Sequence, residues 1–229
     1  MSTLNRLRIV FILVLNITIA GCGSKSKPNN AVAQSDSTKT AATTSSNKTI
    51  LVFGDSLTAG YGLDDQSESY PSVLQTRIDS AKLPYTIVNG GLSGETSAGG
   101  KSRIDWLLKQ HVDVFVLELG ANDGLRGIPV EETEQNLQTI IDHVKAKYPK
   151  AKLVMLGMQV PPNMGATYST DFKNLFPKLA AKNNMTLVPF LLQGVGGVRA
   201  LNQKDGIHPT AEGAKILAAN VWQVIKGIL

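Results

Sequence analysis

Residues 112–119 read VDVFVLEL, which is the strongest strand signal in the chain. A short apolar run of this kind is typical of a strand that is buried on both faces, as in a parallel sheet. Similar runs predict four further strands, so we expect a sheet of five strands, most of them parallel. The other four runs are Thr49 to Phe53, Tyr85 to Val88, Lys152 to Met158 and Thr186 to Pro189.

Helical patterns separate the expected strands. Apolar residues recur at helical spacing between 130 and 147, and Pro129 stands near the start, where proline is tolerated. A second amphipathic pattern closes the chain after Thr210, a residue suited to capping a helix. Alternating strands and helices predict an α/β fold, a three-layer α/β/α sandwich around the sheet. Ligands bind such folds at the carboxyl ends of the strands.

The first residues have the layout of a secretory signal. Arg6 and Arg8 precede an apolar run, Ile9 to Leu15, that is too short to span a bilayer. A buried core helix is the alternative interpretation, but the long polar tract that follows argues against it.

This segment ends in Ile19-Ala20-Gly21-Cys22, which resembles the lipobox of bacterial lipoproteins. In that class the cysteine is acylated and the chain is cut just before it. Cys22 is the only cysteine, so no disulfide can form within the chain. An ordinary signal peptide with an incidental cysteine is the alternative. The resemblance implies a signal peptide at 1–21 and a protein exported and lipid-anchored to a bacterial membrane, facing the periplasm.

Residues 22–47 are rich in Ser, Thr, Asn, Lys and Ala, and they predict a flexible linker. The remaining residues, 48–229, are enough for one domain. The formal net charge of +5 comes mostly from the leader and linker, because 48–229 holds 18 basic and 17 acidic residues. We therefore expect no nucleic-acid partner.

Four short motifs stand at the expected strand ends or just before the closing helix. They are GDSL at 54–57, SGET at 93–96, GAND at 120–123 and DGIHP at 205–209. Each alone has an ordinary explanation as a helix cap, a glycine loop, a turn or a lone histidine. Their shared position, where a doubly wound sheet places its site, favours catalysis instead.

His208 differs from the other two histidines of the chain. It lies in a loop, with Asp205 three residues upstream. We expect His111 at the boundary of a strand and His143 on the solvated face of a helix.

In this order the four motifs resemble those of the SGNH (GDSL) hydrolase family, whose fold is flavodoxin-like. Longer stretches are similar to its lysophospholipase L1, acyl-CoA thioesterase I and arylesterase branch, and the resemblance covers 49–229. The stretches are VFGDSLTAGYGL at 52–63, LELGANDGLRG at 117–127, Pro161-Pro162-Asn163 with Tyr168 and Phe172, and NQKDGIHPTAEG at 202–213.

The resemblance implies a serine esterase or thioesterase. Ser56 would be the nucleophile, His208 its general base and Asp205 the group that orients the imidazole. The oxyanion hole would consist of the Ser56 N–H, the Gly94 N–H and the Asn122 side-chain amide. Chemistry supports these roles, because a serine hydroxyl needs a base, and a carboxylate stabilises the imidazolium that forms.

We further expect an acyl groove between the loop after Asn122 and the loop 161–168. Leu125, Pro162, Met164 and Tyr168 are the candidate substrate-binding residues. The apolar segments Leu191-Leu192 and Phe172 to Leu179 weakly favour acyl chains. The expected partners are a small-molecule ester or lysophospholipid and the membrane that holds lipidated Cys22. We expect a monomer without cofactor or metal, since no phosphate loop, metal-ligand cluster or nucleotide fingerprint is present.

Two other hypotheses fit parts of the sequence. Carbohydrate O-deacetylases, which act on acetyl esters, use the same set of triad and oxyanion-hole residues. A tethered binding lipoprotein on an inactive hydrolase fold is the non-enzyme alternative, but it predicts a broken constellation, and here the five positions are intact.

Overall fold

The computed structural model describes residues 47–229. The predictions for the signal peptide, Cys22 and most of the linker lie outside the described residues. In the described part, five strands form one sheet in the order β2-β1-β3-β4-β5, and every neighbouring pair is parallel. The strands are β1 (Lys48–Gly54), β2 (Tyr85–Gly91), β3 (Val114–Glu118), β4 (Lys152–Leu156) and β5 (Thr186–Val188).

Helices connect each strand to the next. The α-helices are α1 (Ser56–Ala59), α2 (Tyr70–Ser80), α3 (Ser97–Leu107), α4 (Ala121–Leu125), α5 (Val130–Lys147), α6 (Ala166–Asn183) and α7 (Ala211–Ile225). Short 3-10 helices lie at η1 (Gln66–Glu68), η2 (Pro162–Met164) and η3 (Arg199–Leu201). Within residues 47–229, no helix has both the length and the apolar character that a bilayer crossing requires.

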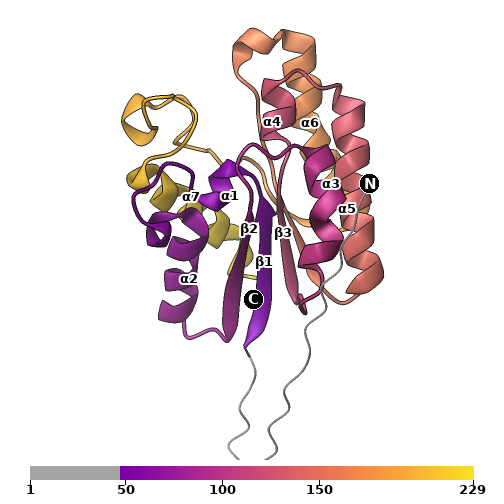
Figure 1. The fold of residues 1–229 in the computed structure, drawn as a ribbon, viewed down its shortest axis with the longest axis vertical. Coiled ribbons are helices and arrows are strands. Elements are labelled where there is room, and N and C mark those ends of the chain that lie inside the picture. Colours follow the sequence, from indigo (N-terminus) through magenta and orange to yellow (C-terminus); the bar gives the residue numbers. More distant parts are fainter. Residues whose placement is uncertain (1–46) are drawn as a thin grey trace, which may run out of the picture. The chain divides into compact units, whose positions relative to one another are not determined.

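The helices cover both faces of the sheet, which gives three layers. Helices α2 and α7 pack against each other on one face, and α3, α5 and α6 lie on the other (Figure 1). The sheet is the centre of the core, since Ile50 to Phe53 of β1 and Val114 to Leu117 of β3 are fully buried. This arrangement confirms the predicted α/β/α sandwich around a mostly parallel sheet of five strands, and here every neighbouring pair is parallel.

The elements begin and end close to where the sequence predicts. Helix α5 begins directly after Pro129, and the Thr210 side chain caps α7 by accepting a hydrogen bond from the Gly213 N–H at 3.3 Å. Strand β3 is shorter than the apolar run that predicted it. It starts at Val114, and the carboxylate of Asp113, just before it, accepts the Thr49 N–H at 2.8 Å.

The strand order reverses between β1 and β3, and this reversal positions the site. The chain passes from β1 to β2 on one side and then crosses back to β3 on the other. A crevice forms where the connections diverge in this way, outside the carboxyl ends of the two strands. The segments that leave β1 and β3 contain Ser56 and Asn122 respectively.

Candidate active site

Ser56 lies in a tight turn between β1 and α1. The Asp55 carboxylate accepts the Leu57 N–H at 3.0 Å and so caps the short helix that begins at Ser56. A side chain at Gly54 would collide with the side chains of Thr58 and Glu118. The GDSL motif is therefore a compact turn, and its glycine is required by close packing beneath the serine.

His208 lies in a turn that Asp205 organises. One oxygen of the Asp205 carboxylate accepts the N–H groups of Ile207 and His208, at 2.9 and 3.1 Å, and the other lies 2.7 Å from His208 Nδ1. The hydrogen bond with the imidazole, followed by the two backbone bonds, lowers the pKa of Asp205 to about 2. Asp205 is thus ionised throughout the neutral range, and it fixes which imidazole nitrogen faces away from it.

The free imidazole nitrogen meets the serine. His208 Nε2 lies 2.9 Å from Ser56 Oγ, although 152 residues separate the two in the chain. The ring of Tyr61 packs on the imidazole with 4.7 Å between ring centroids. Tyr61 is not among the site residues that the sequence predicts, although it lies within the stretch that carries the GDSL motif. Serine, histidine and aspartate thus form one continuous hydrogen-bonded chain.

The three candidate oxyanion donors surround this serine. Ser56 is the first residue of α1, so its N–H has no helical carbonyl to bind. Gly94 has a φ of +79°, a conformation that favours glycine, and a Cβ there would meet nothing within 4 Å. The Asn122 amide donates to Asp55 Oδ2 at 3.1 Å and to the Glu95 carbonyl at 3.0 Å. An oxyanion would have to share one of these amide hydrogens.

A half-buried ion pair holds the Gly94 loop in place. The guanidinium of Arg103 on α3 binds the Glu95 carboxylate through two nitrogens and also donates to the Gly90 carbonyl at 2.8 Å. From the other side, Arg126 donates to the Gly94 carbonyl at 3.1 Å. The loop is therefore anchored to β2, α3 and the end of α4. The SGET motif contains Glu95, but the sequence did not indicate its partner.

Two carboxyl groups lie buried beneath the serine. Glu118 Oε2 accepts from Thr58 Oγ1 at 2.8 Å and from the Asp55 N–H at 3.1 Å. Burial raises the pKa of Asp55 to about 6 and raises that of Glu118 well above its usual value, with the charge of Asp55 as the second cause. Glu118 therefore favours its protonated form, in which it supports Asp55 and Thr58 without adding a second negative charge.

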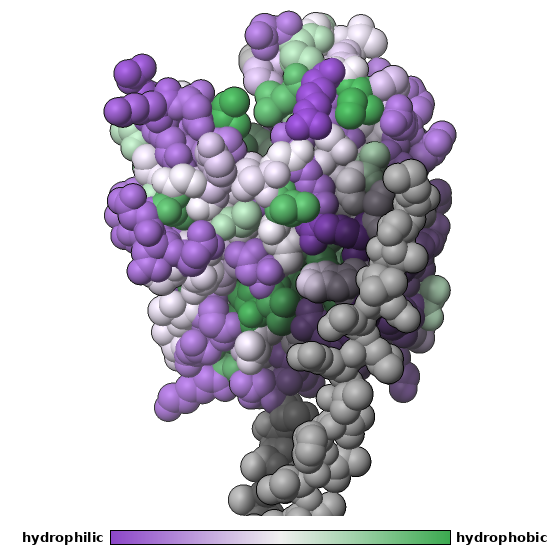
Figure 2. Space-filling view, in the orientation of Figure 1, coloured by the Kyte–Doolittle hydropathy of each residue, from purple (hydrophilic) through white to green (hydrophobic). Residues whose placement is uncertain are grey.

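A cavity of about 620 Å³ opens onto the serine and the histidine. Its floor includes Ser56, Asn122 and His208, and most of its wall is apolar. The apolar wall consists of Leu125, Met158, Val160, Pro161, Phe190, Leu192 and Ile207. The space-filling view shows a hollow at the top of the molecule with apolar side chains on both sides (Figure 2). One wall comes from α4 and the segment after β4, and the other from the loops before α7.

Only part of the expected substrate-binding set lines this cavity. Leu125 does, whereas Met164 and Tyr168 do not, contrary to expectation. The Tyr168 hydroxyl donates to the Ile128 carbonyl at 2.7 Å, and its ring stacks on Phe172. Tyr168 is therefore held between α6 and the turn that follows α4. Met164 lies beside Gly127 at the end of the same loop. The side chain of Pro162 lies outside the described part of the structure.

The sequence did not predict the second wall of the cavity, which comes from the loops before α7. Leu192 lines the cavity, but Leu191 is fully buried in the core. The apolar residues of 172–179 are also core residues of α6, so they do not form an acyl site. Phe190 and Ile207 lacked any periodic signal, because they lie in loops that only the fold brings to Ser56.

The other two histidines lie outside this site. His111 Nε2 lies 3.2 Å from Asp113, and His143 Nδ1 lies 2.9 Å from Asp105 on α3. Both pairs are largely exposed, as the sequence predicted. Among residues 47–229, no three His, Cys, Asp or Glu side chains gather closely enough to hold a metal ion.

Residues 52–216 match the GDSL-like Lipase/Acylhydrolase family. The chain belongs to this family, which confirms the predicted class of serine ester hydrolase.

Several named relatives share this class. The chain is 42% identical to Esterase TesA of Pseudomonas aeruginosa over 80% of its own length and 90% of that protein. It is 39% identical to Thioesterase 1/protease 1/lysophospholipase L1 of Escherichia coli, covering 74% and 79% of the two chains. The crystal structure of the psychrotrophic esterase EstA from Pseudoalteromonas sp., inhibited by monoethylphosphonate, has a TM-score of 0.74 at 34% identity, over 80% of this chain and 98% of that one.

Proposed function

We propose that this chain hydrolyses carboxylic esters or thioesters with medium or long acyl chains through an acyl-enzyme on Ser56. The observation that carries the proposal is the hydrogen-bonded chain from Ser56 through His208 to Asp205, with distances of 2.9 and 2.7 Å. The nucleophile, its base and the group that orients the base are therefore within hydrogen-bond reach.

The mechanism has two half-reactions. His208 takes the Ser56 proton as the hydroxyl attacks the ester carbonyl, and then gives that proton to the leaving alcohol or thiol. Water attacks the resulting acyl-enzyme by the same route in reverse. Asp205, ionised at neutral pH, stabilises the imidazolium in both steps.

The tetrahedral oxyanion would be held by the Ser56 and Gly94 N–H groups and by the Asn122 amide. Removing one such donor typically costs about 2.7–4 kcal/mol of transition-state stabilisation. The Arg103–Glu95 ion pair supports this assignment because it fixes the loop that presents Gly94. The inhibition of the similar esterase EstA by monoethylphosphonate also supports this assignment, because a tetrahedral phosphonate resembles the tetrahedral intermediate.

The apolar cavity favours an acyl chain over an acetyl group. Its volume of about 620 Å³ is far larger than an acetyl group needs, and its wall is mostly hydrocarbon. Each enclosed CH₂ group contributes about 0.8 kcal/mol, and less where the cavity is open to water. The names of the relatives include lysophospholipase and thioesterase, and a lysophospholipid is the substrate class that we propose.

Replacing Leu125 with Asp should lower kcat/KM for p-nitrophenyl laurate about tenfold more than for p-nitrophenyl acetate. Leu125 lines the cavity and is 40% exposed, so a carboxylate there weakens acyl burial without opening the core. Steady-state kinetics on esters from acetate to palmitate measure the effect. Met164→Asp is the matched control, because that residue lies outside the cavity lining and should not change chain-length preference.

Two outcomes would contradict the acyl assignment. An equal loss on laurate and acetate in Leu125→Asp would place the acyl chain elsewhere. A preference of the wild type for acetate, together with deacetylation of glycans, would favour the carbohydrate O-deacetylase instead.

We also propose that the enzyme is exported and held at a bacterial membrane, facing the periplasm, through lipidated Cys22. The support is sequence alone: the basic and apolar leader, the Ile19-Ala20-Gly21-Cys22 segment and the polar tract after it. A polar linker of about 25 residues spans on the order of 25–30 Å, which would let a monomeric domain reach the membrane surface.

Cys22→Ser should abolish acylation of the chain while esterase activity in the cell lysate remains. Only the thiol can carry the thioether-linked lipid, and Cys22 is the sole cysteine. Metabolic labelling with a clickable palmitate, followed by membrane fractionation, checks this in the producing bacterium. Ser24→Ala, next to the motif, is the control and should stay labelled. Lipid label on the Cys22→Ser protein would contradict the anchor.

A further inference from the structure

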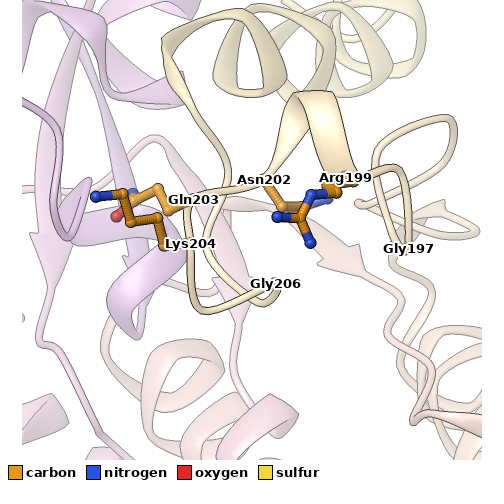
Figure 3. A pocket seen from close by; sticks show the side chains of 6 residues that line it. All are labelled: Gly197, Arg199, Asn202, Gln203, Lys204 and Gly206. Carbon is orange, nitrogen blue, oxygen red and sulfur yellow. The ribbon is translucent and has the colours of Figure 1, made fainter.

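A second cavity, of about 380 Å³, lies beside the acyl cavity and has a different chemical character. It is lined by Gly197, Arg199, Asn202, Gln203, Lys204 and Gly206, all from the loop before His208 (Figure 3). Three of these residues, Gly197, Asn202 and Gly206, also line the larger cavity that contains Ser56. The two cavities are therefore neighbours: apolar side chains line most of the larger one, and the side chains that line the smaller one are polar or basic.

Arg199 is the notable side chain of this second cavity. It is exposed, and it forms no hydrogen bond or ion pair with another side chain in the part of the chain that the structure describes. In the close-up view its guanidinium points into the space between Gly197 and Gly206, while Lys204 points away from it across the loop (Figure 3). A free guanidinium presents several N–H donors in a planar fork that matches a phosphate.

The loop that carries Arg199 is held in a defined shape. The amide of Asn202, which is 8% exposed, donates to the carbonyls of Val195 and Val198 at 2.7 and 2.8 Å. The Gln203 amide donates to the carbonyls of Tyr61 and Pro209 at 2.7 and 3.0 Å. The second cavity is thus fixed relative to His208, and to the aromatic ring that packs on it.

We propose that this second cavity is a subsite for a phosphate group carried by the alcohol portion of the substrate, with Arg199 as its principal ligand. The inference rests on the proposed function. An acyl chain in the apolar cavity places the scissile carbonyl at Ser56, and the alcohol portion then extends past Gly206 towards Arg199. A glycerophosphate headgroup carries its phosphate a few bonds from the ester oxygen. A lysophospholipid, the substrate class proposed above, is an amphiphile whose two ends would match the two cavities.

A matched pair of substrates isolates the phosphate. Lauroyl-lysophosphatidic acid and monolauroylglycerol share the acyl chain, the glycerol and the ester bond, and they differ only in the phosphate. With the full chain, at substrate concentrations below micelle formation, Arg199→Gln should lower kcat/KM for the phosphorylated ester about tenfold, mainly through KM. Its kcat/KM for monolauroylglycerol should stay within about twofold of the wild type. Lys109→Gln removes an exposed cation in the turn after α3 that lines neither cavity, so it is the control and should change neither value.

The remaining outcomes separate the possible explanations. Equal effects of Arg199→Gln on both esters, or no effect on either, would overturn the subsite. Competitive inhibition by inorganic phosphate that depends on Arg199, with no discrimination between the two esters, would assign the site to a free anion and overturn the headgroup proposal. Ser56→Ala should lose both hydrolyses. If it keeps them, the proposed function fails, whatever Arg199 does.

Discussion

Ser56→Ala should lower kcat by on the order of 10⁵-fold or more and abolish covalent labelling by a fluorophosphonate. The Ser56 hydroxyl is the group within 2.9 Å of the His208 nitrogen, and alanine leaves nothing to attack the ester or the phosphonate. Triad members act as a unit, so the activity that remains should be only what the oxyanion hole and substrate binding provide. Ester hydrolysis and gel-based labelling of the purified protein measure the two effects.

The fold should survive this substitution. The hydroxyl hydrogen-bonds His208, while Gly54, Asp55 and Leu57 hold the turn itself. We therefore expect the free energy of unfolding to change by only about 0.5 kcal/mol. Ser102→Ala, on the exposed face of α3, is the matched control and should keep both labelling and activity. Labelling of the Ser56→Ala protein would assign the nucleophile to another residue.

His208→Ala should cost nearly as much, on the order of 10⁵-fold in kcat, because without the base the serine keeps its proton. Asp205→Ala should cost less, on the order of 10³-fold. The Asp205 side chain is 39% exposed, so water can partly replace its bond to the imidazole. His111→Ala removes an imidazole that has a similar carboxylate partner, Asp113, but lies outside the site. His111→Ala should leave kcat unchanged.

The pH dependence of kcat/KM gives a second test of the roles assigned to His208 and Asp205. Since the pKa of Asp205 is lowered to about 2, protonation of Asp205 cannot cause a loss of kcat/KM in mildly acidic buffer. Asp205→Ala should therefore keep any acid limb that the wild type shows in such buffers, even though its kcat/KM is lower throughout. Near-native kcat in His208→Ala, or loss of activity in His111→Ala, would show that the base has been assigned to the wrong histidine.

Sequence alone predicted the five strands and the helices α5 and α7, because the signals for these elements are local. Buried parallel strands are short apolar runs, and the α5 and α7 helices repeat apolar residues at helical spacing. The order of strands and helices then predicted the layers, and the four motifs indicated which strand ends carry the chemistry. The sequence could identify the triad candidates because each lies in a turn formed by its own neighbours, as Asp205 and His208 do.

Tertiary structure alone decided what surrounds those residues. Ser56 and His208 are 152 positions apart in the sequence, and they come within 2.9 Å because the chain after β5, at the edge of the sheet, returns to pack α7 against α2. The segments on this return path bring Phe190, Leu192 and Ile207 to the cavity wall, whereas Tyr168 is held at Ile128, after α4. Glu118 owes its role to burial and to Asp55 and Thr58, which lie about 60 positions earlier in the chain. Local periodicity determines which face of an element is apolar, but packing among distant segments determines which of those faces meet a substrate.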